Sequence, residues 1–156
     1  MKKVYVAFYS WQSDLEAKSN KNLISGCIEK AIKEINDKFS SNFEFEVNID
    51  RDTRNENGSP DIADTIFEKI RKTDIFVCDV TIINNIFSGD QLKKRLTPNP
   101  NVLIELGFAI HVLGWERIIC INNTKFSQLE LLPFDIRGRR ISTYNSDNYD
   151  SNTNSN

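Results

Sequence analysis

The fold is decided by one apolar run, Ile75-Phe76-Val77-Cys78-Asp79-Val80. A short run with a single charged residue is typical of a strand that is buried on both faces of a parallel sheet. Val4 to Tyr9 is rich in residues that favour strands, and Phe43 to Ile49 alternates apolar and polar side chains, so both predict earlier strands. A fourth strand is predicted over Arg117 to Ile121, and a short fifth over Arg140 to Tyr144.

Apolar residues at helical spacing lie between these strands. The repeat covers Asn22 to Phe39 and Asp61 to Arg71, and a third helix is predicted to begin at Pro100 after an Asn99 cap. Strands and helices that alternate in this way predict an α/β fold, a flavodoxin-like doubly wound parallel sheet of about five strands with helices on both faces. Ligands of such sheets bind beyond the carboxyl ends of the strands, so we expect the site there.

The length of 156 residues suits one domain, which we expect to span residues 1–144. From Asn145 onward the sequence is almost entirely Asn, Ser, Asp and Thr, and such a composition buries too little apolar surface to fold. Residues 145–156 are therefore predicted to be a disordered polar tail or linker. Because the chain runs straight into a strand pattern and has no apolar run of membrane-spanning length, we expect a cytoplasmic protein.

The composition argues against several classes of partner. A net charge of −2 provides no basic field, so neither nucleic acid nor a membrane surface is expected as a partner. The three cysteines are far apart among apolar neighbours, which predicts buried free thiols and no metal site. Neither GxGxxG nor GxxxxGK[ST] occurs, which argues against an ordinary dinucleotide dehydrogenase or a P-loop protein.

Glu105 is the main catalytic candidate. The helix that carries it has an apolar arc formed by Val102, Leu103, Leu106, Ala109, Ile110 and Leu113. Glu105 lies about 40° beyond the edge of this arc, near the positive end of the helix, where a half-dehydrated carboxylate suits a cationic ligand. The alternative is a solvated glutamate that only improves the helix start. His111 lies about 240° around the helix from Glu105 and is the one histidine of the chain, which excludes serine–histidine and cysteine–histidine triads.

Polar and aromatic residues follow each of the first three strands. After the first strand come Ser10, Trp11 and Asp14, where Trp11 either stacks on a base or nicotinamide ring or anchors the surface. Arg51 begins a loop of mixed charge up to Pro60, and it either grips a phosphate or is solvated. Asp79 ends the third strand, where it either holds ribose hydroxyls or caps the following loop.

Four segments together resemble the bacterial TIR-like (Toll/interleukin-1 receptor-like) nucleotide-binding proteins. They are Phe8–Asp14, Asp74–Thr81, Asn99–Gly107 and Leu132–Asp135, and the resemblance covers residues 3 to about 144. Nucleoside 2-deoxyribosyltransferases carry a similar helix with a catalytic glutamate, but all four segments in this order favour TIR. The final helix of the family has no clear counterpart after Tyr144.

The resemblance implies a site. In TIR enzymes that cleave NAD⁺, the position of Glu105 is catalytic, and the positions from Tyr9 to Trp11 line the nicotinamide and ribose pocket. The loop from Arg51 to Pro60 is implied to gate the site and to mediate assembly. We group Asp14, Asp79 and Asn101 with the substrate-binding residues.

The expected function is an NAD⁺ glycohydrolase that releases nicotinamide and ADP-ribose or a cyclic isomer, with NAD⁺ as substrate and no cofactor. We expect it to act in antiphage defence and to be activated by TIR–TIR self-association or by a sensor domain or protein outside this chain. Two alternatives remain. One is a non-catalytic nucleotide-sensing or signalling scaffold. The other is a nucleoside deoxyribosyltransferase-like enzyme, which needs a second carboxylate from Asp79 or Asp14.

Overall fold

The computed structural model describes residues 3–39, 45–50, 62–85 and 95–150. Its centre is a five-stranded sheet of order β2-β1-β3-β4-β5 in which every neighbouring pair is parallel. The strands are β1 (Lys3–Ser10), β2 (Phe45–Asp50), β3 (Ile75–Asp79), β4 (Ile118–Asn123) and β5 (Ile141–Tyr144). This is the flavodoxin-like strand order, so the predicted α/β fold class is confirmed.

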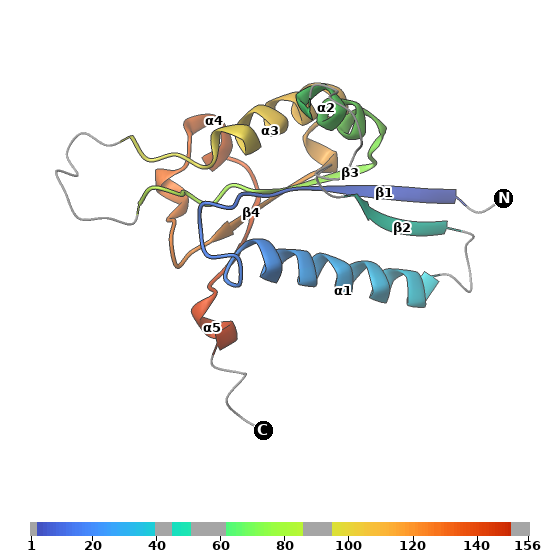
Figure 1. Cartoon of the computed structure of the whole chain (residues 1–156), viewed down its shortest axis with the longest axis horizontal. Helices are drawn as coiled ribbons and strands as arrows, with labels where there is room; N and C mark the ends of the chain where they lie inside the picture. Colours follow the sequence, from blue (N-terminus) through green and yellow to red (C-terminus); the bar gives the residue numbers. More distant parts are fainter. Residues whose placement is uncertain (1–2, 40–44, 51–61, 86–94, 151–156) are drawn as a thin grey trace.

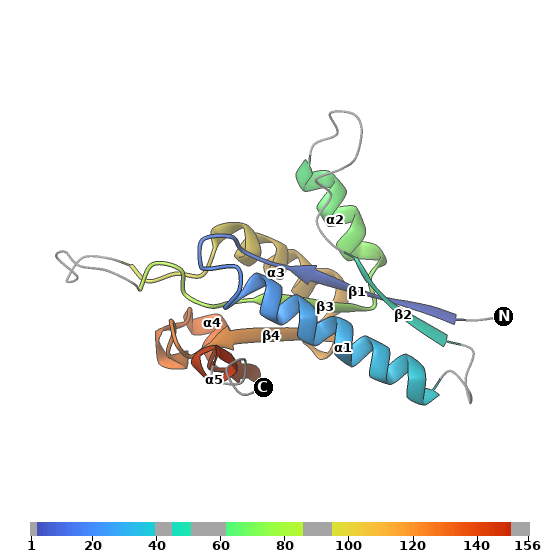
Figure 2. The same cartoon turned by 60° about the horizontal axis from the view of Figure 1, so that its bottom comes forward.

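Helices cover both faces of the sheet. They are α1 (Lys21–Phe39), α2 (Ile62–Lys72), α3 (Pro100–Leu113), α4 (Phe134–Arg137) and α5 (Asp147–Asp150), with short 3₁₀ turns at Trp115–Arg117 and Leu129–Leu131. Figure 1 shows α1 and α5 on one side of the sheet and α2, α3 and α4 on the other. Figure 2 shows α1 lying lengthwise across its face of the sheet. None of the described helices is both long and apolar enough to cross a membrane.

The larger part of the core lies between the sheet and α3. Side chains of a strand alternate between its two faces, so Phe8 and Ser10 of β1 lie on the α3 face while Tyr9 lies on the α1 face. The core on the α3 face contains Phe8, Ile70, Phe76, Cys78, Val80, Ile82, Val102, Leu106, Ala109, Leu113, Cys120, Leu132 and Ile136. The α1 face has a smaller core of Tyr9, Ile24 and Val77. Ser10 therefore ends β1 directly beneath the helix that carries Glu105.

The C-terminal end of the domain differs from the sequence prediction. Residues 145–150 are ordered, although disorder was expected from Asn145 onward. Ser146 is buried because Asn123 of β4 binds it twice: Asn123 Nδ2 donates to Ser146 Oγ (3.0 Å), and the backbone N–H of Ser146 donates to Asn123 Oδ1 (3.3 Å). Tyr149 then packs edge-on against Tyr144. A polar segment is ordered here by buried hydrogen-bonding groups of the sheet, while residues 151–156 lie outside the described part.

Candidate active site

Glu105 and Ser10 meet at the carboxyl end of the central strand. Ser10 is the last residue of β1, and Glu105 lies in the second turn of α3. The Ser10 hydroxyl donates a short hydrogen bond of 2.5 Å to Glu105 Oε2. Ser10 is 2% exposed, whereas Glu105 is partly exposed. A buried hydroxyl thus orients a carboxylate that still faces the outside of the domain.

The start of α3 is fixed by its predicted cap. Asn99 Oδ1 accepts hydrogen bonds from the backbone N–H groups of Asn101 (2.8 Å) and Val102 (3.2 Å), and Pro100 opens the helix. The other end of the same side chain, Asn99 Nδ2, donates to Asp14 Oδ2 over 2.7 Å. Asp14 therefore ties the loop after β1 to the helix that carries Glu105.

A small hollow lies beside the carboxylate. It is lined by Phe8, Tyr9, Ser10, Trp11, Ile66 and Glu105. The Nζ atom of Lys21 stands 3.3 Å from the centre of the partly exposed Trp11 ring, a cation–π contact that holds the ring. The hollow has a volume of about 20 Å³, room for about one water molecule.

Asp79 ends β3 as predicted, but it is not exposed to a ligand. It is fully buried, and its oxygens accept hydrogen bonds from Gln12 Nε2 (3.0 Å), Asn20 Nδ2 (3.1 Å) and the backbone N–H of Thr81 (3.0 Å). The bond to Thr81 caps the loop after β3, which was the alternative interpretation. The other two bonds hold the loop after β1 onto β3. The carboxylate is thus enclosed by its own hydrogen-bond donors.

Tyr9 requires a similar correction. The period of two along β1 places its ring on the α1 face, against Ile24 and Val77, and so on the opposite side of the sheet from Ser10. Burial, reinforced by the nearby negative charge of Asp79, raises the pKa of the phenol far above its ordinary value. Tyr9 is nevertheless among the residues that line the hollow beside Glu105.

Comparison with known proteins identifies the family. Residues 23–146 match the family described as "CAP12/Pycsar effector protein, TIR domain". The chain belongs to this TIR-domain family. One solved structure with a similar fold is the 2-desoxiribosyltransferase from Leishmania mexicana, at 14% identity and a TM-score of 0.43. The match covers 76% of this chain and 65% of that structure, so the chain spans less than two thirds of its length. No curated protein matches the sequence.

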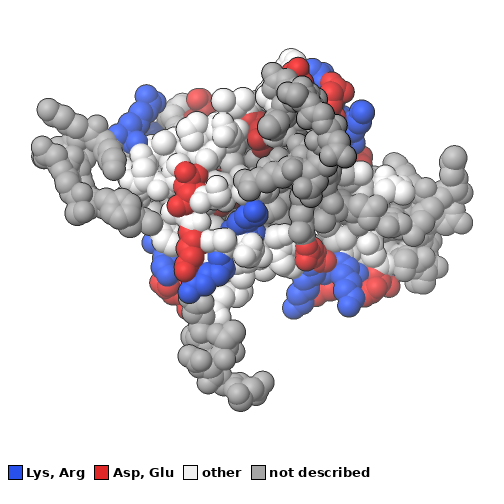
Figure 3. All heavy atoms as spheres, viewed as in Figure 1, with Lys and Arg blue, Asp and Glu red and all other residues white. Residues whose placement is uncertain are grey.

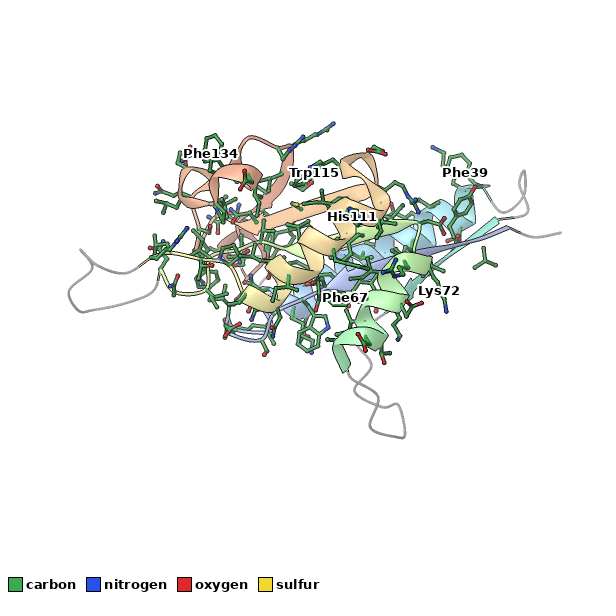
Figure 4. All side chains as sticks on the ribbon, turned by 90° about the horizontal axis from the view of Figure 1, so that it is seen from above. Phe39, Phe67, Lys72, His111, Trp115 and Phe134 are labelled. Atoms are coloured by element: carbon green, nitrogen blue, oxygen red, sulfur yellow. The ribbon has the colours of Figure 1, made fainter. Side chains whose placement is uncertain are left out.

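Two predicted site residues remain to be considered, Asn101 and Arg51. Asn101 is exposed in the first turn of α3, and Arg51 lies outside the described residues. His111 is exposed on α3. Figure 4 shows it from above, in the same helix layer as Phe67 of α2. In the parts of the chain that the structure describes, no group of three or more His, Cys, Asp or Glu side chains is placed to hold a metal ion. On the face shown in Figure 3, positive and negative side chains are interspersed.

Sequence reasoning missed a buried polar network behind the site. Asn123 Nδ2 donates to Asn20 Oδ1 (3.0 Å) and to the carbonyl oxygen of Ser19 (3.1 Å), and Asn20 in turn binds Asp79. Asn20, Asp79 and Asn123 are all fully buried. The sequence pattern that could have indicated this network is a polar residue at the end of each of two neighbouring parallel strands, Asp79 on β3 and Asn123 on β4. The network fixes the loop that carries Trp11.

Proposed function

We propose that this TIR domain is an NAD⁺ glycohydrolase in which Glu105 is the catalytic carboxylate. One observation carries the proposal: Glu105 is held by the buried hydroxyl of Ser10 at the carboxyl end of β1, next to the ring of Trp11. This is the edge at which doubly wound sheets bind their ligands. The family match over residues 23–146 supports it independently.

The residues suit cleavage of the bond between nicotinamide and ribose. That reaction passes through an oxocarbenium-like state, which a nearby carboxylate stabilises by opposing the developing positive charge and binding ribose hydroxyls. Nicotinamide leaves as a neutral molecule because its ring nitrogen takes up the electron pair of the broken bond. Water then adds to the ribose carbon and loses a proton, which gives ADP-ribose; an adenine nitrogen of the same molecule in place of water gives a cyclic isomer.

The other groups of the site have supporting roles in this proposal. Ser10 orients the carboxylate toward the ribose, and the Trp11 ring offers a flat surface for nicotinamide. We assign contacts with the rest of the nucleotide to Asn101, in the first turn of α3, and to Asp14, in the loop after β1, which Asn99 holds against the start of that helix. Membership of an effector family supports a cytoplasmic role in antiphage defence, with self-association or a sensor as the activating event.

A nucleoside deoxyribosyltransferase-like enzyme is the second candidate. Such an enzyme needs a second carboxylate, and Asp14 is the observation in its favour because it is exposed and bound to Asn99 at the start of α3. The burial of Asp79 speaks against that residue in the same role. Incubation of the protein with NAD⁺, and separately with a deoxynucleoside and a free base, distinguishes the two reactions by chromatography of the products.

The decisive variant is Glu105→Gln, which keeps the shape of the side chain and removes its charge. We expect nicotinamide release to fall by about 10²–10³-fold or more, the loss typical of one transition-state electrostatic contact. The free energy of unfolding should change by less than about 1 kcal/mol because the side chain is partly exposed. Glu34→Gln, at an exposed glutamate of α1, is the matched control and should keep full activity. Undiminished release by folded Glu105→Gln protein contradicts the proposal, and no release by the wild type in any condition favours the scaffold.

A further inference from the structure

Two cysteine side chains lie side by side beneath α3. Cys78 of β3 and Cys120 of β4 are direct partners in the parallel register, and their sulfur atoms are 3.7 Å apart. Both belong to the core on the α3 face, with exposed fractions of 0% and 2%. Cys27 is exposed on α1, so it lies on the other side of the sheet from this pair. The sequence predicted all three thiols to be buried, which is correct for two of them.

The backbone geometry of the pair suits a covalent bond. Neighbouring strands of a sheet run about 4.7–4.9 Å apart, and bridged cysteines have Cα atoms about 4.4–6.8 Å apart. Both side chains belong to the core on the same face of the sheet, and their sulfur atoms are already in contact at 3.7 Å. We propose that Cys78 and Cys120 are a redox-active dithiol that closes to a reversible disulfide when a peroxide reaches Cys120.

Cys120 is the sulfur that a small oxidant meets first. It lines a pocket together with Trp115, Arg139 and Arg140, whereas Cys78 is enclosed beneath it. Figure 4 shows Trp115 on the opposite side of α3 from Phe67 of α2. The guanidinium of Arg139 lies 4.4 Å from the centre of the Trp115 ring. This pocket shares no residue with the hollow beside Glu105, so oxidant and nucleotide enter by separate routes.

The hydrogen bond between the sulfurs assigns their roles. The Cys78 thiol donates to Cys120, which lowers the pKa of Cys120 and favours its thiolate. Burial, followed by this same bond, raises the pKa of Cys78 and keeps it a thiol. Because Cys120 is also the one of the two that lines the pocket, we assign it as the nucleophile and Cys78 as the resolving residue.

The chemistry then proceeds in two balanced steps. The Cys120 thiolate attacks one oxygen of hydrogen peroxide, the O–O bond breaks, and the departing hydroxide takes up a proton to leave as water. The Cys120 sulfenic acid so formed is attacked by the Cys78 sulfur, which loses its proton as the hydroxyl leaves as a second water. Two thiols are oxidised to a disulfide while one peroxide is reduced to two waters. A cellular thiol reductant reverses the change, as expected for a cytosolic dithiol.

The test uses the full chain with Cys27→Ser, which removes the exposed thiol and with it intermolecular links. Hydrogen peroxide is added at neutral pH to the folded protein, and intact mass, thiol labelling and peptide mapping follow the reaction. We expect both thiols to disappear together with a mass loss of about 2 Da for the two hydrogens, a cross-linked Cys78–Cys120 peptide, and full reversal by dithiothreitol. This outcome does not depend on the catalytic role of Glu105.

Three results overturn the proposal. The first is that both thiols stay reduced. The second is a sulfinic or sulfonic acid on one cysteine without a cross-link. The third is a reaction rate that does not rise with peroxide concentration, because the thiols then react only after global unfolding.

A second pair of variants assigns the roles in the Cys27→Ser chain. Cys78→Ser should stop at a Cys120 sulfenic acid that dimedone traps, and Cys120→Ser should react at least tenfold more slowly. If either variant fails to fold, the mass and rate measurements on Cys27→Ser alone still decide.

Discussion

Ser10 is the residue on which the orientation of Glu105 depends, because its hydroxyl is buried and donates directly to the carboxylate. We expect Ser10→Ala to lower the rate of nicotinamide release by about 10–100-fold, the effect of a small misplacement of a catalytic group. The Michaelis constant for NAD⁺ should change less than the turnover number, since alanine leaves the wall of the site in place. Steady-state kinetics with chromatographic detection measure both.

Ser142→Ala is the matched control because Ser142 is exposed on β5. It should leave turnover unchanged. Ser10→Ala protein that keeps wild-type turnover contradicts the positioning role, and in that case the hydrogen bond between Ser10 and Glu105 is structural.

Two tyrosines on the α1 face differ in how their hydroxyls are satisfied. The Tyr144 hydroxyl donates to the carbonyl oxygen of Ser19 over 2.9 Å, whereas the buried Tyr9 hydroxyl has no hydrogen-bond partner within the described residues. We expect Tyr144→Phe to lower the free energy of unfolding by about 1 kcal/mol, the net worth of one such bond. Tyr9→Phe should raise it by about 1 kcal/mol because an unsatisfied polar group is removed. Urea unfolding at pH 7 compares the two variants, and a clear loss of stability in Tyr9→Phe refutes the assignment.

The same tyrosines predict an alkaline loss of stability. Burial first, and then the charge of Asp79, raises the pKa of both phenols in the folded state. Above about pH 10 the unfolded chain loses these protons while the folded chain keeps them, so the stability falls as the pH rises, by about 1.4 kcal/mol per pH unit for the more deeply buried Tyr9 and by less for Tyr144. The contribution of the tyrosine protons to stability is complete below the pKa of tyrosine in the unfolded chain. It is lost as the pH rises above that pKa. The slope above pH 10 should therefore be shallower in Tyr9→Phe.

At the scale of elements, the long helices α1 and α3 each carry a glycine at a position where the packing leaves room for a side chain. A Cβ atom at Gly26 of α1 or at Gly107 of α3 meets nothing within 4 Å, and both residues are exposed. Alanine at either position should raise the free energy of unfolding by about 0.4–1 kcal/mol. Because the Gly107 side of α3 faces outward, Gly107→Ala should keep wild-type nicotinamide release. Thermal and urea unfolding measure the gain.

Gly114 provides the contrast, since it ends α3 with φ +79° and a Cβ there approaches Glu116 Oε1 to 2.6 Å. Gly114→Ala should destabilise the domain by about 1 kcal/mol or more, because a side chain is strained in this conformation. Equal effects of alanine at Gly107 and Gly114 contradict the expected difference between the two positions.

The elements themselves were predictable, and the polar bonds between them were not. The asparagine cap and the proline that begins α3 are local signals, and the structure confirms both. The alternation of side chains along β1 shows that Tyr9 and Ser10 lie on opposite faces of the sheet. Which helix covers the face with Tyr9 becomes clear only from the structure. The buried role of Asp79 rests on bonds to Gln12 and Asn20, residues 67 and 59 positions away, which no local pattern reveals. For the same reason the ordering of residues 145–150 by Asn123 was missed.

At the scale of the whole molecule, activation is expected to depend on neighbouring copies. An enzyme that consumes NAD⁺ has to be inactive by default, and TIR domains are expected to work in assemblies. We expect the specific rate of nicotinamide release to rise at least tenfold with protein concentration or with a crowding agent, in step with the mass seen by light scattering. The loop from Arg51 to Pro60, to which the resemblance assigns a part in assembly, lies outside the described residues. Full specific activity in a dilute monomer refutes activation by self-association and leaves the role of Glu105 intact.

The strand order has a consequence for synthesis on the ribosome. β1 is made first but lies inside the sheet, and its inner neighbour is β3, which ends only at Asp79. The roughly 70 residues translated after β1 take about 3–14 s at about 5–20 residues per second. During that time the inner edge of β1, with Phe8 and Tyr9, has no partner in the nascent chain. We therefore expect the growing polypeptide to expose this apolar edge until β3 has been made.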